Sequence, residues 1–179
     1  ATLEETAYFL NLTVKVPIPV VVVGAMRPSS ALGADGGLNL LNGVRVAASP
    51  AARGMGVLLV LNDEINAARE VAKTSNFRVQ TFVTRDFGML GYADADAVRF
   101  YRRPLRVTAP DTEFDVRAMT DLPRVDIIEA YAGADGALVD AAVSAGAKGI
   151  ISAGLPSGSP SPAQQAALQK FEQEEATTY

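Results

Sequence analysis

One stretch of the sequence decides how the chain folds: Val20-Val21-Val22-Val23-Gly24-Ala25-Met26-Arg27-Pro28-Ser29-Ser30. Four consecutive valines favour a strand buried on both faces, as in a parallel sheet covered by helices. Small residues follow the strand, and open α/β sheets bind their ligands in loops at the carboxyl ends of strands. We therefore expect an α/β fold with an open, flavodoxin-like parallel sheet and a functional loop directly after this strand.

The neighbouring segments extend this strand into a β-α-β unit. Apolar periodicity predicts three elements around it: a helix over 2–14, a helix over 38–48 and a strand over 56–61. The order strand, helix, strand predicts a parallel pair with a right-handed crossover. The loops after the two strands then open at the same edge of the sheet, which brings Asn62 and Asp63 close to Ala25 and Met26.

The rest of the chain predicts a hairpin, a connection and a second, smaller α/β unit. Short strands are expected over 79–84 and 98–101, with a hairpin tip at Asp94 and Asp96, since two acids are too few to hold calcium. The second unit is predicted to contain strand 125–128, helix 136–145, strand 149–153 and helix 163–175. The predicted domains are residues 1–101 and 124–179, joined by a proline-rich connection over 102–123.

Composition excludes several classes of protein and of catalytic site. The 179 residues contain neither histidine nor cysteine, which excludes disulfides, thiolate zinc sites and catalysis by a Ser-His-Asp or Cys-His arrangement. A formal net charge of -4 argues against a nucleic-acid partner, and no apolar run is long enough to span a membrane. Lysine is therefore the best available proton handler, and Lys73 stands beside Thr74, Ser75 and Asn76.

The chain begins at Ala1 without an initiator methionine and enters a helix at once. Thr2 and Glu5 have the spacing of a capping box, in which each side chain bonds a backbone N–H of the first turn. The simplest interpretation of this start is that a preceding segment is missing. The second predicted unit has only two strands, too few for a stable sheet, so we expect it to be cut short or to depend on a partner.

Several short motifs occur in an order and at a spacing that are typical of one enzyme family. They are Thr2-Leu3-Glu4-Glu5-Thr6-Ala7, Val23-Gly24-Ala25-Met26-Arg27-Pro28-Ser29, Ala34-Asp35-Gly36 with Asn39, Asn62-Asp63, Lys73-Thr74 and Gly91-Tyr92. Through these motifs, from Ala1 to about Ser159, the chain closely resembles the bacterial L-asparaginases, above all their type II branch. Motifs spread over so much of the chain are not expected by chance.

The resemblance implies an amidohydrolase that converts L-asparagine to aspartate and ammonia, with L-glutamine left open as a further substrate. It also implies a threonine nucleophile, no metal or organic cofactor, and a homotetramer built as a dimer of dimers. The type II branch favours a periplasmic or secreted protein, with a cytoplasmic location left open. Both threonines that the family uses fall outside these residues, so the chain as given is predicted to be inactive by itself.

The resemblance assigns roles to a few residues of this sequence. Lys73 matches the family lysine that helps to activate a threonine and to polarise the attacking water, since an ammonium stabilises developing negative charge. Ala25 and Met26 match a loop whose backbone carbonyl accepts the substrate's side-chain amide. Ser157 matches a loop that reaches a neighbouring subunit's site, and Ala1 stands where the family has an aspartate.

Two other interpretations remain open. The alanine at position 1 and the absent threonines also fit a catalytically inactive or truncated module that binds a small molecule or mediates assembly. An asparaginase-like amidotransferase subunit, which releases ammonia for a partner protein, is the third interpretation. We favour the hydrolase because its motifs cover most of the chain, while the departure from the family at Pro156 and Ser157 leaves the choice between asparagine and glutamine open.

Overall fold

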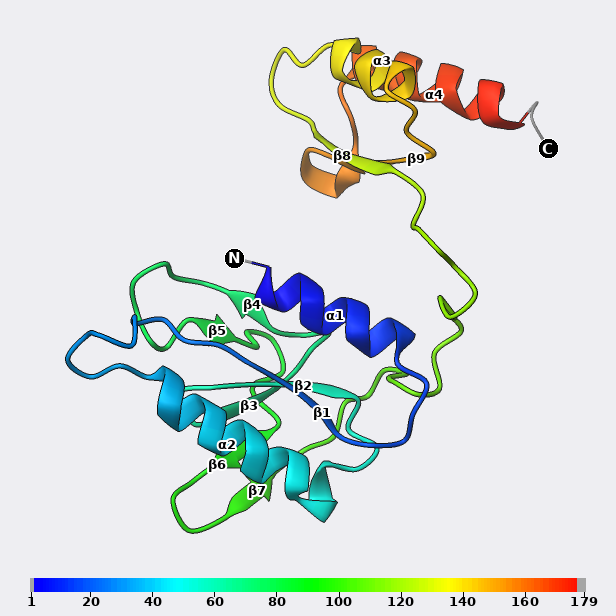
Figure 1. Ribbon diagram of the computed structural model, residues 1–179. Coiled ribbons are helices and arrows are strands. Elements are labelled where there is room, and N and C mark those ends of the chain that lie inside the picture. The colour runs from blue at the N-terminus through cyan, green and yellow to red at the C-terminus, as the bar shows by residue number, and fades with distance from the viewer. Residues whose placement is uncertain (1, 177–179) are drawn as a thin grey trace. The chain divides into compact units, whose positions relative to one another are not determined.

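The computed structural model describes residues 2–176 of the chain (Figure 1). The chain forms two compact units, residues 1–118 and 119–179, and each unit is described by itself. Ala1, which stands where the family has an aspartate, lies outside the described residues. Among those that are described, no helix combines the length and the apolar character that crossing a membrane requires.

The first unit consists of a five-stranded sheet, a small hairpin and the helices α1 and α2. In chain order its elements are α1 (Leu3–Thr13), β1 (Val20–Val23), α2 (Gly36–Ala48), a 3-10 turn (Pro50–Ala52), β2 (Val57–Leu61), β3 (Glu64–Ala67), β4 (Ala72–Lys73), β5 (Phe82–Val83), β6 (Gly91–Ala93) and β7 (Val98–Phe100). The large sheet has the strand order β1-β2-β3-β6-β7, and β4 pairs with β5 in the hairpin.

The predicted β-α-β unit is confirmed by the parallel pairing of β1 with β2, which begins with Val20 opposite Val57 and ends with Val23 opposite Val60. Strand β2 is buried along its whole length. Its alternate side chains enter two apolar clusters, Leu58 and Val60 on the side of α2, and Val57, Leu59 and Leu61 on the side of α1. The two helices therefore cover opposite faces of this pair of strands (Figure 1).

After β2 the chain reverses at once instead of entering an open loop. Asn62 and Asp63 have φ angles of 51° and 63°, and β3 then pairs antiparallel with β2. Asparagine and aspartate tolerate this left-handed backbone, and two such residues in a row are typical of tight hairpin turns. The large sheet is therefore parallel only between β1 and β2, and β3 is an element that the apolar pattern did not predict.

The hairpin tip predicted at Asp94 and Asp96 is confirmed, since β6 and β7 pair antiparallel on either side of it. Arg99 forms ion pairs with both carboxylates, at 3.2 Å to Asp94 and 2.6 Å to Asp96. These acids are thus engaged by a cation of their own hairpin. The strand predicted over 79–84 is shorter than expected and is limited to β5.

The capping box expected at the start of α1 does not form. The side chain of Thr2 makes no hydrogen bond to the first turn, although its carbonyl accepts the backbone N–H of Thr6 at 2.9 Å. Instead, the carboxylate of Glu4 accepts the backbone N–H of Lys73. The first turn of α1 is thus tied to β4, beside one of the predicted site residues.

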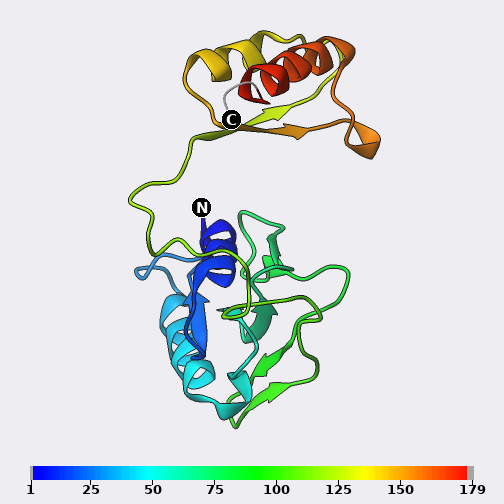
Figure 2. The same cartoon turned by 90° about the vertical axis from the view of Figure 1, so that its right-hand side faces the viewer.

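The second unit is a two-stranded parallel sheet with helices packed on one face (Figure 2), and its order of strand, helix, strand, helix is the predicted one. Its elements are β8 (Val125–Glu129), α3 (Ala137–Ser144), β9 (Gly149–Ala153), a 3-10 turn (Pro156–Gly158) and α4 (Pro162–Ala176). Ile128 of β8 packs with Val139 and Ala142 of α3 in a buried cluster. On the other face, Ile127 and Ile151 are cross-strand partners whose exposed fractions are 72% and 55%.

Candidate active site

The loop after β1 is held by a carboxylate at the start of α2. Asp35 accepts the backbone N–H of Met26 at 2.9 Å and the backbone N–H of Arg27 at 2.8 Å. The guanidinium of Arg27 donates to the carbonyl of Gly33 at 2.9 Å, which closes the loop on itself. The loop that the sequence places at the sheet edge is thus fixed by the residues that follow it.

The hydrogen bonds to Asp35 favour its ionised form. Burial by itself raises the pKa of this carboxyl group, but the backbone N–H groups of Met26 and Arg27 and the amide of Asn39 outweigh burial. The pKa of Asp35 therefore lies below its usual value. At neutral pH Asp35 is a carboxylate, suited to accept hydrogen bonds rather than to carry a proton.

Asn39 joins the loop after β1 to the turn after β2. Its Nδ2 donates to the carbonyl of Gly24 at 2.9 Å, and its Oδ1 accepts the backbone N–H of Asn62 at 3.0 Å. Asn39 is only 1% exposed, so these bonds are shielded from water. The prediction that Asn62 lies near the loop of Met26 is confirmed, and the link between them is an asparagine of α2.

Lys73 carries a half-buried side chain in the β4–β5 hairpin. The residue pairs with Phe82, and its Nζ lies 5.9 Å from the centre of the Phe82 ring. Within the part of the chain that the structure describes, no carboxylate forms an ion pair with Lys73. An ammonium group that rests on an aromatic ring and lacks a carboxylate partner is available to a ligand or to a reacting group.

Met26 and Lys73 border the same apolar cluster. Met26 and Leu3 pack on the cluster that contains Phe82, which is the strand partner of Lys73. Glu4, the residue after Leu3, accepts the backbone N–H of Lys73. The structure therefore brings the loop of Met26 and the hairpin of Lys73 together around the first turn of α1 (Figure 1).

Ser157, which is also expected at the site, belongs to the second unit. It is exposed and has a φ angle of 71° within the 3-10 turn of residues 156–158, a left-handed conformation that is uncommon for a residue with a side chain. Three of the expected site residues, Lys73, Ala25 and Met26, share the first unit, whereas Ser157 does not.

The sequence pattern predicts no role in the site for Asp35 or Asn39, although both stand in the motifs that carry the family resemblance. An acid just before a helix is expected to bond the backbone N–H groups of that helix. Asp35 makes no such cap bond and reaches to Met26 instead. The available signal was Asn39, because an asparagine in a helix that packs on a buried strand needs polar partners.

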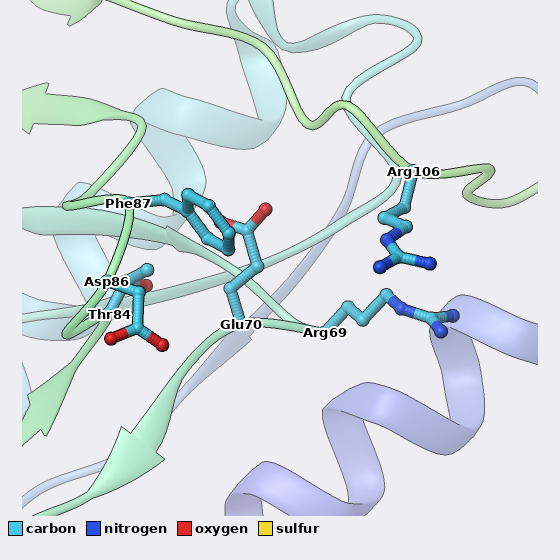
Figure 3. A pocket seen from close by; sticks show the side chains of 6 residues that line it. All are labelled: Arg69, Glu70, Thr84, Asp86, Phe87 and Arg106. Carbon is cyan, nitrogen blue, oxygen red and sulfur yellow. The ribbon is translucent and has the colours of Figure 1, made fainter.

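A separate polar cavity, of about 270 Å³, lies where β3 and β5 end (Figure 3). Its lining residues are Arg69, Glu70, Thr84, Asp86, Phe87 and Arg106. Glu70 is paired with Arg102 at 2.5 Å, and the guanidinium of Arg69 lies 5.6 Å from the ring centre of Tyr8. Because these charges hold neighbouring elements and no lysine lines the cavity, we do not place the active site there. No group of three or more acidic side chains suited to a metal ion occurs among residues 2–176.

Comparison with known proteins gives a consistent result. Residues 1–106 match the family model described as Asparaginase, N-terminal, and residues 124–178 match the model described as Glutaminase/Asparaginase C-terminal domain. L-asparaginase 2 of Bacillus subtilis (strain 168) is 51% identical over 164 residues, which are 92% of this chain and 44% of the relative. A Haemophilus influenzae protein named "Probable L-asparaginase periplasmic" is 46% identical over 169 residues, 94% of this chain and 48% of the relative.

Among solved structures, the crystal structure of a probable cytoplasmic L-asparaginase from Campylobacter jejuni matches with a TM-score of 0.92 and 42% identity. That match covers 97% of this chain and 57% of the other chain. The chain spans about half the length of the curated relatives it matches.

Proposed function

This chain belongs to the asparaginase family, and from that premise we propose that it carries part of the active site of an L-asparaginase. The reaction is hydrolysis of the side-chain amide of L-asparagine to aspartate and ammonia. In this proposal Lys73 supplies a cationic group, and the loop of Ala25 and Met26 binds the substrate's amide. The proposed chemistry requires no metal or organic cofactor.

The observation that carries the proposal is the state of the Lys73 ammonium group. It is half-buried against Phe82, and among the described residues it has no ion pair. A hydroxyl next to such a group loses its proton more readily, because the ammonium stabilises the resulting oxyanion. The hairpin of Lys73 and the loop of Met26 also meet at the first turn of α1, and a site for one small substrate requires such proximity.

The proposed hydrolysis has two steps. A threonine oxygen, which the resemblance places outside these 179 residues, attacks the amide carbon, and ammonia leaves after the amide nitrogen has gained a proton. Water then attacks the acyl-threonine ester, which releases aspartate and restores the hydroxyl. In each step, Lys73 stabilises the negative charge that develops on the reacting oxygen atoms. The Ala25 carbonyl accepts a hydrogen bond from an N–H of the substrate's amide.

Lys73→Met tests the proposal because it keeps the bulk of the side chain and removes the charge. Ammonia release from L-asparagine is measured with this chain and with a chimera in which residues 2–179 replace the matching residues of the Bacillus subtilis relative, which keeps its own residue at the place of Ala1, where the family has an aspartate. We expect the chimera to release ammonia. We expect Lys73→Met to lower its rate by about 100-fold or more, the usual effect of removing a group that stabilises charge in the transition state.

Lys148→Met is the matched control, because Lys148 is exposed and lies in the second unit. It removes one positive charge in the same way and is expected to leave the rate unchanged. Equal rates for Lys73→Met and the unsubstituted chimera would remove Lys73 from the mechanism. A chimera that releases no ammonia from L-asparagine, L-glutamine or D-asparagine would contradict the hydrolase and favour a binding module.

We also propose a homotetramer built as a dimer of dimers, in which Ser157 reaches a neighbouring subunit's site, and a periplasmic or secreted location. The names of similar proteins support this location only in part, since the Haemophilus influenzae relative is named as periplasmic and the Campylobacter jejuni structure is of a probable cytoplasmic protein. Sedimentation velocity tests the assembly, and cell fractionation tests the location.

The ratio of rates with L-asparagine and L-glutamine in Ser157→Asn tests the role of that residue in substrate choice.

A further inference from the structure

We propose that Asp35 is a positioning residue that aims the carbonyl of Ala25 at the substrate's amide. This inference rests on the proposed function, because it explains how the loop after β1 distinguishes an amide from a carboxylate. Asp35 itself does not touch the substrate in this proposal. It acts through the peptide bond between Ala25 and Met26.

The peptide bond is planar and trans, so the carbonyl of one residue and the N–H of the next point in opposite directions. The N–H of Met26 is directed at Asp35 and bonds both carboxylate oxygens, at 2.9 Å and 3.1 Å. The carbonyl of Ala25 must therefore point away from Asp35. A single carboxylate thus fixes the direction of a backbone acceptor on the opposite side of the loop.

The carbonyl aimed in this way is free to bind. Among residues 2–176 no group donates a hydrogen bond to the oxygen of Ala25, whereas the carbonyl of the preceding Gly24 is occupied by Asn39. A hydrogen bond from N–H to a carboxylate also polarises the peptide group, which makes its carbonyl a stronger acceptor. The ionised Asp35 therefore both orients and strengthens the acceptor at Ala25.

The neighbouring contacts leave the loop little room to turn. Asp35 accepts the N–H of Arg27 as well as that of Met26, so two consecutive peptide groups are held by one side chain. A Cβ built on Gly36, the residue after Asp35, would lie 3.3 Å from the Cβ of Ala25. The start of α2 thus lies close to the residue whose carbonyl is proposed to bind the amide, with room there for a glycine but little room for a larger residue.

The chemical consequence is discrimination between substrate and product. An amide N–H donates to a carbonyl, whereas the side-chain carboxylate of aspartate has no proton to donate at neutral pH. Correct aim at Ala25 therefore favours asparagine, and a misdirected carbonyl removes that preference. The affinity ratio of asparagine to aspartate reports this role, since general damage to the fold weakens both ligands together.

Asp35→Asn tests the inference, because an amide has one acceptor oxygen and would turn its own N–H₂ toward one of the two backbone donors. Binding of L-asparagine and of L-aspartate is measured by calorimetry in the chimera carrying Lys73→Met, in which turnover is slow. We expect Asp35→Asn to lower the affinity for asparagine by about 10-fold, which corresponds to the loss of one hydrogen bond. The affinity for aspartate is expected to stay nearly unchanged. An equal loss for both ligands, or an unchanged ratio, would overturn the inference.

Asp115→Asn is the matched control, because Asp115 likewise accepts a backbone N–H, from Arg117 at 3.0 Å, but is exposed on another segment. It is expected to leave both affinities unchanged. Because binding is measured rather than turnover, the outcome is separate from that of the proposed function, which the release of ammonia decides.

If Asp35→Asn fails to fold, Gly36→Ala provides a second test. Its new methyl group lies 3.3 Å from the Cβ of Ala25 and leaves the Asp35 carboxylate in place, whereas a methyl group on Gly37 meets no atom of another segment within 4 Å. We expect Gly36→Ala to lower the ratio of asparagine to aspartate affinity and Gly37→Ala to leave it unchanged. The same ratio in both variants would contradict the proposed aim of the carbonyl.

Discussion

Asn39 satisfies two backbone groups that belong to different loops, the carbonyl of Gly24 and the N–H of Asn62. Asn39→Ala leaves both groups without their partner at a buried position. We expect the free energy of unfolding to fall by about 2–3 kcal/mol, because each buried polar group left unpaired costs about 1–3 kcal/mol. Urea unfolding measures the change, with the exposed neighbour Leu40→Ala as control. A loss no larger than that of the control would show that water replaces the amide freely.

The depressed pKa of Asp35 predicts how its contribution to stability depends on pH. A carboxyl group whose pKa is lower in the folded state than the usual 3.8 contributes stability above that value and loses it as the pH falls through the folded pKa. We therefore expect the difference in unfolding free energy between the wild type and Asp35→Asn to be constant near neutral pH and to shrink below about pH 4. Urea unfolding at a series of pH values measures this difference. A gap that widens as the pH falls would contradict the assigned hydrogen bonds.

The residues of the site differ in how far the sequence could predict them. Lys73 stands out because the chain offers no histidine or cysteine and because a family motif contains it. The partner of Asp35 could not be predicted, since an acid before a helix has a local alternative, the bond to its own helix. Only the path of the loop back to Met26 decides between the two, and that path is a property of the folded unit.

Among the elements of the fold, helix α2 approaches β1 closely because of one glycine. A Cβ built on Gly43 would lie 2.5 Å from Cγ1 of Val23, a β-branched side chain with little freedom to move. Gly43→Ala is expected to lower the free energy of unfolding by about 1–3 kcal/mol, the usual cost of overpacking. The control Gly37→Ala, where the new methyl group meets no atom of another segment within 4 Å, is expected to raise the free energy of unfolding by about 0.5–1 kcal/mol. Guanidinium unfolding measures the free energy of unfolding of the two variants. Similar values would contradict close packing at Gly43.

The sequence predicts the longer elements well and the shorter ones poorly. The helices at 2–14 and 38–48 and the first two strands are confirmed to within about two residues, because an apolar pattern, periodic in the helices and continuous in the strands, marks each of them. Strands β4 and β5 have two residues each and carry no periodicity, so their pairing depends on contacts distant in sequence. The missed strand β3 did have a local signal, the Asn62-Asp63 turn, which is typical of hairpins.

At the scale of the whole molecule, the second unit has an exposed apolar face that predicts association. Ile127 and Ile151 face each other across β8 and β9 on the side of the sheet away from α3 and α4. We expect the chain to self-associate at high concentration, and the double change Ile127→Thr and Ile151→Thr to lower the sedimenting mass while keeping the strand propensity. Leu138→Gln, which replaces an apolar side chain that is 55% exposed on α3, is the control. The same mass distribution in all three proteins would contradict an associating sheet face.

The loop after β1 has a further consequence, because three of its four residues from 24 to 27 are already bonded to α2 or to Asp35, the residue just before this helix. The conformational entropy of this segment is lost when the chain folds and not when a ligand arrives. A small molecule that binds there should meet a preorganised surface. Its entropy of binding should then contain only a small unfavourable contribution from ordering the backbone. Slow hydrogen exchange at the amides of Met26 and Arg27 before any ligand is added would be the direct sign of that early order.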